Sequence, residues 1–325
     1  MATTHMDPFT DPENHDPEGP LPAEERCPQG TVKRPTRFLL LADIHANREA
    51  LQAVLQDARG CYDAIWFLGD VVGYGPRPVE CVQFLKVCVR RRWKAGNHEV
   101  FAAGLLRPGS PVRPTENMRF TDGKHKEILE QTAPRLWAWL KKGLMEERIK
   151  PIYRRCRDVD LVLAHANLLD HTESYLYPDD TLNLLENLEH ARKMTGGQES
   201  RSCWVAIGHS HMVFLAQRTS NGVELLPVRY REKISLRNGA YVINPGSVGQ
   251  PRDGDPRASY AILDVKGQTV EFRRVDYPVQ KVQRELQRQG YPQDLVETLS
   301  TGRRNGVTEH FERVYQATEE GLQPR

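Results

Sequence analysis

The stretch RFLLLADIHANREALQAVL, residues 37–55, decides the fold. It begins with a continuous apolar run, 38–42, which is typical of a strand that is covered on both faces. The polar motif DIH at 43–45 ends this run. Asn47 can cap the helix that follows, on which apolar residues recur at helical spacing. The stretch therefore predicts a buried strand, a short polar loop and an amphipathic helix.

The same order recurs further along the chain. A second apolar run at 64–68 ends in Gly69-Asp70, and Pro78 opens a second helical pattern. The segment 93–95 then leads into the motif GNHE at 96–99. A βαβαβ pattern of this kind indicates a layered α/β fold.

The chain divides by composition into several parts. Residues 1–35 are acidic and proline-rich and lack an apolar stretch, so they predict a disordered leader and not a secretory signal. We expect the folded domain at 36–305. Within it, residues 105–147 interrupt the α/β rhythm and predict a helical insertion or cap. Residues 306–325 are expected to form a polar C-terminal tail.

The bulk properties exclude several classes of function. The 325 residues carry a net charge of +2, which gives no electrostatic reason to expect nucleic acid as a partner. Six cysteines without a CxxC pair favour reduced thiols over a disulfide framework or a zinc–thiolate site. No segment is apolar for long enough to predict a membrane span, and we expect a cytoplasmic protein.

Five apolar runs each end in side chains that can bind a metal ion. Because the carboxyl ends of strands form the ligand-binding rim of α/β folds, we expect these side chains to converge. Each motif alone is common by chance, but their placement at successive strand ends is not. The candidate ligands are Asp43, His45, Asp70, Asn97, His165, His209 and His211.

The number and type of these ligands predict a two-metal centre. Seven ligands are too many for one tetrahedral zinc ion, and they suffice for two ions that share a carboxylate. Carboxylate, imidazole and amide donors without thiolate suit Mn, Fe or Zn. Two metal ions about 3.5–4 Å apart form a known clamp for in-line displacement at phosphorus.

The motifs DIH, GD, GNHE and GHSH, with His165, resemble the motif set of the calcineurin-like metallophosphoesterases, over residues 38–303. Two longer segments, GDVVGYGPRPVECV at 69–82 and NPGSVGQPRDGDPRASYAILD at 244–264, resemble a prokaryotic subgroup described as the YfcE-like or MJ0936-like phosphodiesterase branch. The resemblance implies a four-layer α/β/β/α sandwich, in which two mixed sheets are flanked by helices.

The resemblance also implies a role for each candidate residue. Asp43, His45 and His211 would hold one metal ion. Asn97, His165 and His209 would hold the second, and Asp70 would bridge the two. A metal-bridging hydroxide would attack phosphorus, with His98 as the catalytic histidine that is not a ligand. Two divalent ions are implied, Mn foremost, with Fe, Zn or Ni as alternatives.

The residues that contact the substrate are less defined by the sequence. Arg252 can bind phosphate as a fork of donors or be a solvated loop arginine, and Asn244 can approach the site from a strand end. Tyr74 stands where the GDxVDRG motif of protein Ser/Thr phosphatases has arginine, which argues against that activity.

We therefore predict hydrolysis of a phosphodiester or phosphomonoester, with a small, nucleotide-like phosphorylated substrate. Two alternatives remain at this point. One is a non-catalytic scaffold with the same fold, and the other is a nuclease that uses the same two-metal chemistry.

Overall fold

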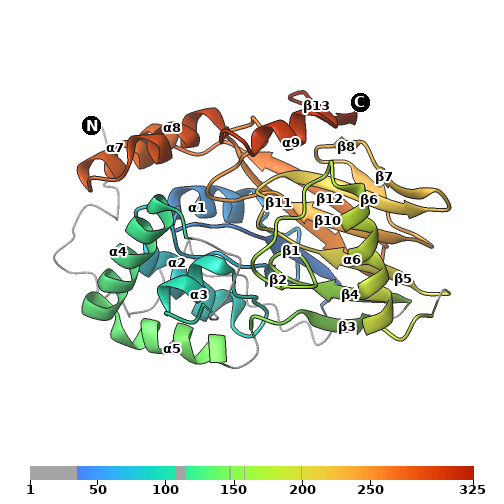
Figure 1. Ribbon diagram of the computed structural model, residues 1–325, viewed down its shortest axis with the longest axis horizontal. Coiled ribbons are helices and arrows are strands. Elements are labelled where there is room, and N and C mark those ends of the chain that lie inside the picture. Colours follow the sequence, from blue (N-terminus) through green and yellow to red (C-terminus); the bar gives the residue numbers. More distant parts are fainter. Residues whose placement is uncertain (1–34, 107–113, 146–147, 157, 199) are drawn as a thin grey trace, which may run out of the picture.

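The computed structural model describes residues 35–106, 114–145, 148–156, 158–198 and 200–325 (Figure 1). The expected leader, 1–35, lies outside the described residues except for its last one. Two large mixed sheets form the centre of the fold, and helices flank them. The α/β sandwich predicted from the sequence is confirmed. None of the described helices is long and apolar enough to cross a membrane.

The first large sheet has the strand order β2-β1-β11-β12-β9. Its strands, in chain order, are β1 (Arg37–Leu41), β2 (Ala64–Phe67), β9 (Lys233–Ser235), β11 (Ala258–Asp264) and β12 (Thr269–Val275). β1 is parallel to β2 and antiparallel to β11. The N-terminal βαβ unit is therefore closed on its other side by a strand from late in the chain.

The second large sheet has the order β3-β4-β5-β10-β6-β7. Its strands are β3 (Ile152–Cys156), β4 (Val159–Leu163), β5 (Ser202–Ala206), β6 (Val213–Thr219), β7 (Gly222–Leu225) and β10 (Ala240–Pro245). β4, β5 and β10 run parallel at its centre, and the other three strands pair antiparallel. A small third sheet contains β8 (Val228–Arg229), β13 (Tyr315–Ala317) and β14 (Gly321–Pro324).

The apolar run of β1 serves two cores. Phe38 and Leu40 belong to the core between the two large sheets, together with residues of β4, β5 and β10. Leu39 and Leu41 point to the opposite face and pack in the core beneath the outer helices. Because successive side chains of a strand alternate between its faces, a strand that is buried on both sides reads as a continuous apolar run.

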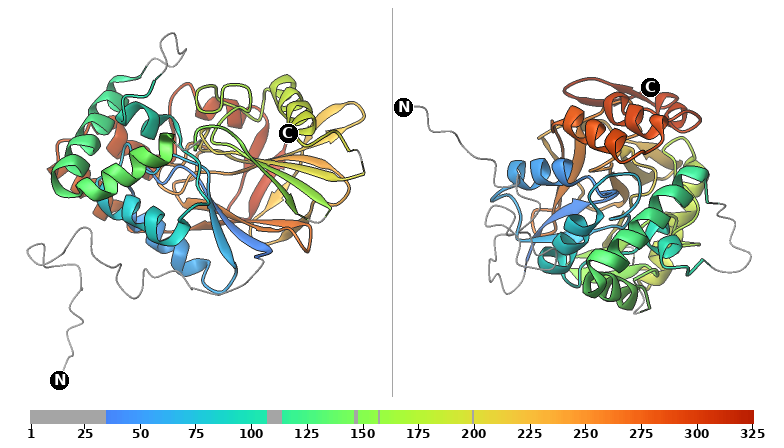
Figure 2. Two further views of the ribbon diagram at one scale, coloured as in Figure 1. Left: turned by 90° about the horizontal axis from the view of Figure 1, so that it is seen from below. Right: turned by 90° about the vertical axis from the view of Figure 1, so that its left-hand side faces the viewer.

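The helices cover the outer faces of the sheets. They are α1 (Arg48–Asp57), α2 (Pro78–Phe84) with its π-helical extension η2 (Leu85–Val89), α3 (Asn97–Ala102), α4 (Glu116–Thr132), α5 (Pro134–Met145), α6 (Thr181–Met194), α7 (Val279–Arg288), α8 (Gln293–Thr301) and α9 (Thr308–Glu312). As expected, the Asn47 side chain caps α1 by accepting from the Ala50 N–H. Figure 2 shows α4 and α5, in green, at one end of the sheets. α4 packs on α2 and α3, beside the ends of the first strands.

The C-terminal segment differs from the polar tail that composition suggested. Residues 306–325 form α9, β13 and β14. Phe311, Tyr315 and Leu322 are buried and belong to the same hydrophobic cluster as Phe38 and Leu40. Three well-spaced apolar side chains are enough to anchor this segment, although its average composition is polar.

A tight helix contact provides a test of this packing. Gly143 of α5 lies against Trp93, and a Cβ at position 143 would come within 2.3 Å of the indole. Trp93 is buried and also packs on Trp139, so it has little room to move. We expect Gly143→Ala to lower the free energy of unfolding by about 1–3 kcal/mol, measured by urea denaturation.

Gly123 of α4 is the matched control, because a Cβ there meets nothing within 4 Å. Gly123→Ala is expected to raise the free energy of unfolding by about 0.5–1 kcal/mol, since alanine loses less backbone entropy in a helix. Changes of the same sign in both variants would contradict the proposed contact.

Candidate active site

The loops that follow β1, β2, β4 and β5 meet the start of α3 at one end of the two sheets. All seven candidate ligands lie there, and none is more than 7% exposed. Their donor atoms form two groups that could each hold a metal ion. One contains Asp43, His45, Asp70 and His211, and the other contains Asp70, His165 and His209. Asp70 belongs to both.

In the first group, two imidazoles meet over two carboxylates. The Nε2 atoms of His45 and His211 are 3.1 Å apart. His211 Nε2 lies 3.5 Å from an Asp43 oxygen, and His45 Nε2 lies 3.8 Å from Asp70 Oδ2. Four donor atoms thus surround one point.

The second group is centred on His165. Its Nε2 lies 3.3 Å from the same Asp70 oxygen, Oδ2, and 3.1 Å from His209 Nδ1. The amide oxygen of Asn97 is 3.2 Å from this Nε2 and adds a fourth donor. One oxygen atom of Asp70 therefore faces both groups.

The protonation of the imidazoles fits bound cations. The Nδ1 atoms of His45 and His211 lie 2.9 and 2.6 Å from backbone carbonyl oxygens, so each must carry a proton there. In the neutral ring, Nε2 then presents a lone pair to the cluster. Two such lone pairs at 3.1 Å repel each other unless a cation lies between them. The donor set therefore fits divalent metal ions with mixed nitrogen and oxygen ligands.

Burial and neighbouring charges shift the pKa values of these side chains in different directions. Burial lowers the pKa of His45, His209 and His211 well below the usual value, which keeps the rings neutral. For His165, burial lowers the pKa, but the Asp70 carboxylate outweighs it and raises the pKa to about 9. Burial raises the pKa of Asp43 to about 7.

The backbone of the ligand loops is strained. Asp43, His45, Asp70, His209 and His211 all have positive φ, between 47° and 66°. Residues with a Cβ rarely adopt this conformation, at a cost of about 1 kcal/mol or more each. This backbone turns the side chains at the strand ends toward a common centre.

Two glycines are required by the same close packing. A Cβ at Gly69 would lie 2.4 Å from His165 Nδ1, and one at Gly96 would lie 2.0 Å from Asp70 Oδ1. The glycines of the GD and GNHE motifs therefore allow the metal-binding side chains to approach the backbone of neighbouring loops.

Glu99 holds two of these loops together. One carboxylate oxygen accepts from the N–H groups of Asp70 and Gly96, at 2.9 and 2.8 Å. The other accepts from Val71 and Val72, at 2.7 and 3.0 Å. Burial raises the pKa of Glu99 to about 7, whereas these N–H donors favour the ionised form. Glu99 thus caps α3 through the Gly96 N–H, and it also anchors the loop after β2.

His98 lies beside the cluster on a separate support. Its backbone N–H donates to Asp70 Oδ1 at 3.0 Å, and its Nδ1 is 2.8 Å from Asp122 of α4. Its ring packs edge-on against Tyr74 at 4.5 Å. Burial lowers the pKa of His98, but the carboxylate of Asp122 outweighs it, so the pKa is raised well above its usual value.

Asn244 and Arg252, the two residues expected to contact the substrate, have different surroundings. Both ends of the Asn244 amide bond protein groups: its Nδ2 donates to Gly208 O and Ser210 Oγ, and its Oδ1 accepts from Gly246 N–H. Asn244 thus braces the loop that carries His209 and His211.

Arg252 is only 1% exposed and lies beside the first ligand group. Its guanidinium donates to Gln250 Oε1 at 2.9 Å and lies over the Tyr74 ring. Its Nε has no hydrogen-bond partner among the described residues. Arg252 is therefore a buried cation whose neighbours leave a donor available, and not a solvated loop arginine.

Two residues near the cluster were missed in the sequence. Asp122 lies on a helix of mostly polar composition, where one more acidic residue gives no signal. Tyr175 stacks on His209, with ring centroids 4.1 Å apart and planes at 16°. It comes from the irregular segment between β4 and α6, which has no periodic pattern to place it.

The Glu99 contacts give a testable consequence. In Glu99→Gln, an NH2 group replaces one acceptor oxygen and leaves two buried N–H groups without an acceptor. We expect the free energy of unfolding to fall by about 2–4 kcal/mol in urea denaturation, with weaker Mn binding in calorimetry. Glu127→Gln, at an exposed position of α4, is the control and should change stability by less than about 0.5 kcal/mol. Equal stability of the two variants would contradict this role of Glu99.

Comparison with known proteins agrees with the geometry. Residues 37–268 match the family model described as the calcineurin-like phosphoesterase superfamily domain. The uncharacterized protein MJ0912 of Methanocaldococcus jannaschii is 31% identical over 280 residues, which span 81% of this chain and 97% of that protein. The crystal structure of a metallophosphoesterase from Sphaerobacter thermophilus is 33% identical, with a TM-score of 0.61, over 83% of this chain and 100% of that one.

A more distant match has a named activity. A symmetrical bis(5'-nucleosyl)-tetraphosphatase of Legionella pneumophila is 25% identical over 131 residues, which span 39% of this chain and 43% of that protein. The family and the histidine–aspartate cluster together imply divalent metal ions. The chain belongs to the calcineurin-like phosphoesterase superfamily and is a hydrolase of phosphoric esters.

Proposed function

We propose that this chain is a dinuclear metal-dependent phosphoesterase. Asp43, His45 and His211 would hold one ion, Asn97, His165 and His209 would hold the other, and Asp70 would serve both. The observation that carries the proposal is the position of Asp70 Oδ2, within 3.8 Å of His45 Nε2 and 3.3 Å of His165 Nε2. One oxygen between two imidazole groups is the arrangement that a shared carboxylate ligand requires.

The ions would be divalent, with Mn as the first choice, because mixed imidazole, carboxylate and amide donors suit it. When bound, they supply charge neutralisation at the phosphoryl group and a water of lowered pKa. Fe, Zn and Ni satisfy the same donors and are included in the test below.

His98 is proposed as the catalytic acid. Asp122 is its positioning residue, because its carboxylate bonds Nδ1 at 2.8 Å and favours the protonated ring. The proton on Nε2 can then be donated to the leaving oxygen or to a phosphoryl oxygen. The contact of the His98 ring with His45, at 4.8 Å, supports this role because it brings the ring to the edge of the first metal group.

Arg252 is proposed to bind a phosphoryl oxygen of the substrate. The support is its burial beside His211 and its unpaired Nε. A guanidinium that is removed from water gains most from an anionic partner, and its planar fork matches phosphate. We do not propose a substrate contact for Asn244, since its amide already bonds the His209–His211 loop.

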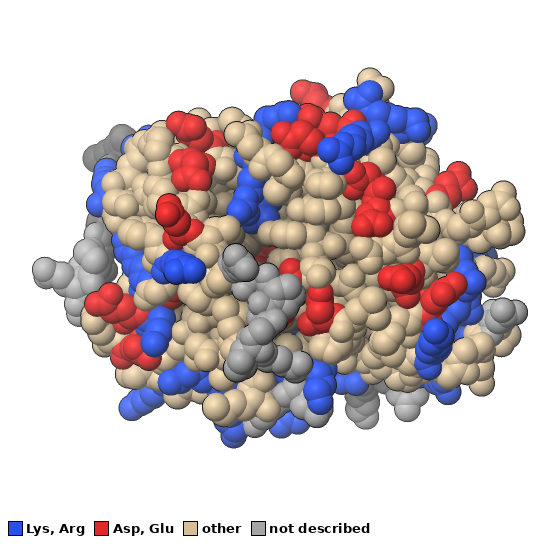
Figure 3. Space-filling model, in the orientation of Figure 1, with Lys and Arg blue, Asp and Glu red and all other residues tan. Residues whose placement is uncertain are grey.

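A small nucleotide-like substrate is favoured over a nucleic acid. The name of the Legionella relative supports a nucleotide-type substrate. Figure 3 shows basic and acidic side chains interspersed over the upper and middle parts of one face of the molecule, and the chain carries a net charge of only +2. A duplex or long single strand is bound mainly through its phosphates, which a strong excess of basic side chains would favour.

Hydrolysis assays test the catalytic proposal. We expect turnover of bis(p-nitrophenyl) phosphate or p-nitrophenyl phosphate with added Mn, and a fall in kcat of about 10²–10⁴-fold in His98→Ala with the metal content unchanged. His190→Ala, on α6, is the control histidine and should keep wild-type kcat. Absence of turnover with Mn, Fe, Zn and Ni, or an unchanged kcat in His98→Ala, would refute the proposal.

Metal binding tests the bridging role of Asp70 separately. Protein stripped with a chelator should bind two Mn ions per chain in calorimetry and should melt at a higher temperature when loaded. Asp70→Asn is expected to weaken both binding events, because one side chain serves both groups. Asp180→Asn is the matched control, since asparagine caps α6 as well as aspartate does. Loss of only one ion in Asp70→Asn would argue against a shared ligand.

A further inference from the structure

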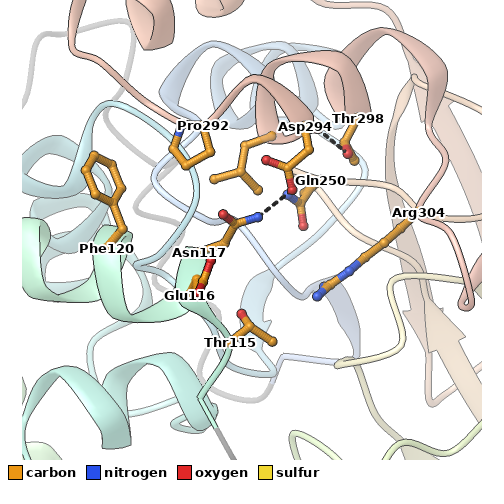
Figure 4. A pocket seen from close by; sticks show the side chains of 10 residues that line it. Thr115, Glu116, Asn117, Phe120, Gln250, Pro292, Asp294, Thr298 and Arg304 are labelled. Carbon is orange, nitrogen blue, oxygen red and sulfur yellow. Dashed lines mark hydrogen bonds between the residues drawn. The ribbon is translucent and has the colours of Figure 1, made fainter.

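A pocket of about 590 Å³ opens beside the metal-ligand cluster, between the first turns of α4 and α8 (Figure 4). Gln250 connects the two. Its side chain lines the pocket and accepts from Arg252, while its backbone oxygen accepts from His211 Nδ1 at 2.6 Å. A ligand whose phosphate lies at the cluster can therefore extend past Gln250 into this pocket. Its volume falls in the range of about 300–1,000 Å³ that is typical of small-molecule sites.

Arg304 provides a second cation in the pocket wall. Figure 4 shows its side chain reaching toward the pocket, on the side of Gln250. Burial lowers the pKa of Arg304, but the neighbouring Tyr74, Tyr175 and Tyr177 outweigh this and raise it. The preceding residue contrasts with it: Arg303 is more than half exposed and pairs with Glu312 at 2.6 Å. Arg304 is thus half-buried and forms no ion pair with a carboxylate among the described residues, so an anionic ligand would stabilise its charge.

The two arginines lie around the same pair of tyrosines. Arg252 lies over the Tyr74 ring at 5.6 Å and its Nη1 is 3.5 Å from the Tyr175 hydroxyl. Arg304 interacts with the same two phenols. One cation therefore lies at the metal-ligand cluster and the other at the pocket. A ligand with two anionic groups in succession could contact both cations.

The other end of the pocket has a different chemistry. Figure 4 places Phe120 on the side opposite Arg304, with Asn117 and Asp294 between them. The Asp294 carboxylate accepts from Asn117 Nδ2 at 2.5 Å, and Glu116 lies nearby. These carboxylates disfavour phosphate and suit hydroxyl or amino donors. Phe120 is 39% exposed and can present its ring to a planar group.

We propose that this pocket binds the distal part of a nucleotide-type substrate with two linked phosphates. The second phosphate contacts Arg304, and the nucleoside extends toward Asn117, Phe120 and Asp294. The inference rests on the proposed phosphoesterase function, because it assigns the first phosphate to the cluster and Arg252.

Calorimetry on the Mn-loaded full chain tests the pocket independently of turnover. The probe is α,β-methylene-ADP, whose phosphorus–carbon link resists hydrolysis, and methylenediphosphonate is the reference that lacks the nucleoside. We expect the nucleotide to bind at least tenfold more tightly than the reference. Arg304→Gln should weaken nucleotide binding at least tenfold, whereas Arg303→Gln should leave it unchanged.

A second variant separates loss of the pocket from loss of the fold. Phe120→Ala, at a partly exposed helix position, should weaken the nucleotide about fivefold without affecting the reference. Melting temperatures verify that each variant is folded. If Arg304→Gln does not fold, nucleotide binding by Phe120→Ala tests the pocket in its place.

Two results would overturn the pocket: equal affinity of wild type for nucleotide and reference, or equal effects of Arg304→Gln and Arg303→Gln. Failure of the proposed function would look different. In that case the Mn-loaded protein would not hydrolyse bis(p-nitrophenyl) phosphate. It would still bind the nucleotide through Arg304, and this binding would support the pocket.

Discussion

The carboxylate of Glu99 is the constraint on which the site depends. It receives four backbone N–H groups, from Asp70, Val71, Val72 and Gly96, and so joins the loop after β2 to the start of α3. Since Asn97 and His98 begin that helix, the same carboxylate sets the position of Asp70 relative to both. The reciprocal bond from the His98 N–H to Asp70 Oδ1 closes this small network. Hydrogen bonds that join both segments fix the relative positions of the reacting side chains more closely than separate loops could.

The helical segment that interrupts the α/β rhythm completes the site from the opposite side. Asp122 and His125 lie three residues apart on α4, on the same face of the helix. Asp122 bonds His98, while His125 accepts from Gly73 N–H at 2.9 Å and lies 2.8 Å from Gly75 O. The loop that carries Tyr74 is therefore held by α4. Helix α4, which lies outside the strand-end pattern, therefore positions His98, the proposed acid, and the Tyr74 loop beside the proposed phosphate contact.

The sequence was sufficient for the fold class and for the convergence of the seven candidate ligands. Both predictions depend on local signals. Apolar runs mark the strands that are buried on two faces, and the carboxyl ends of such strands form one ligand-binding rim in α/β folds. Asp122 and Arg304 could not be predicted in the same way. Each lies in a polar helix or loop, and its importance comes from which distant residues it meets. The segment 306–325 shows the same limit, since Phe311 and Tyr315 gain their role only by packing into the hydrophobic cluster that contains Phe38 and Leu40.

The positive φ angles of the ligand loops have a consequence for how such a site evolves. Five of the seven candidate ligands occupy a conformation that opposes folding, and buried imidazoles with facing lone pairs add repulsion. The unmetallated site therefore lowers the stability of the fold that carries it, and activity and stability are in a trade-off. Glycine at these positions would relax the backbone and remove the metal-binding side chain. Substitutions that inactivate the site thus tend to stabilise the fold, and only selection for activity keeps the metal-binding residues.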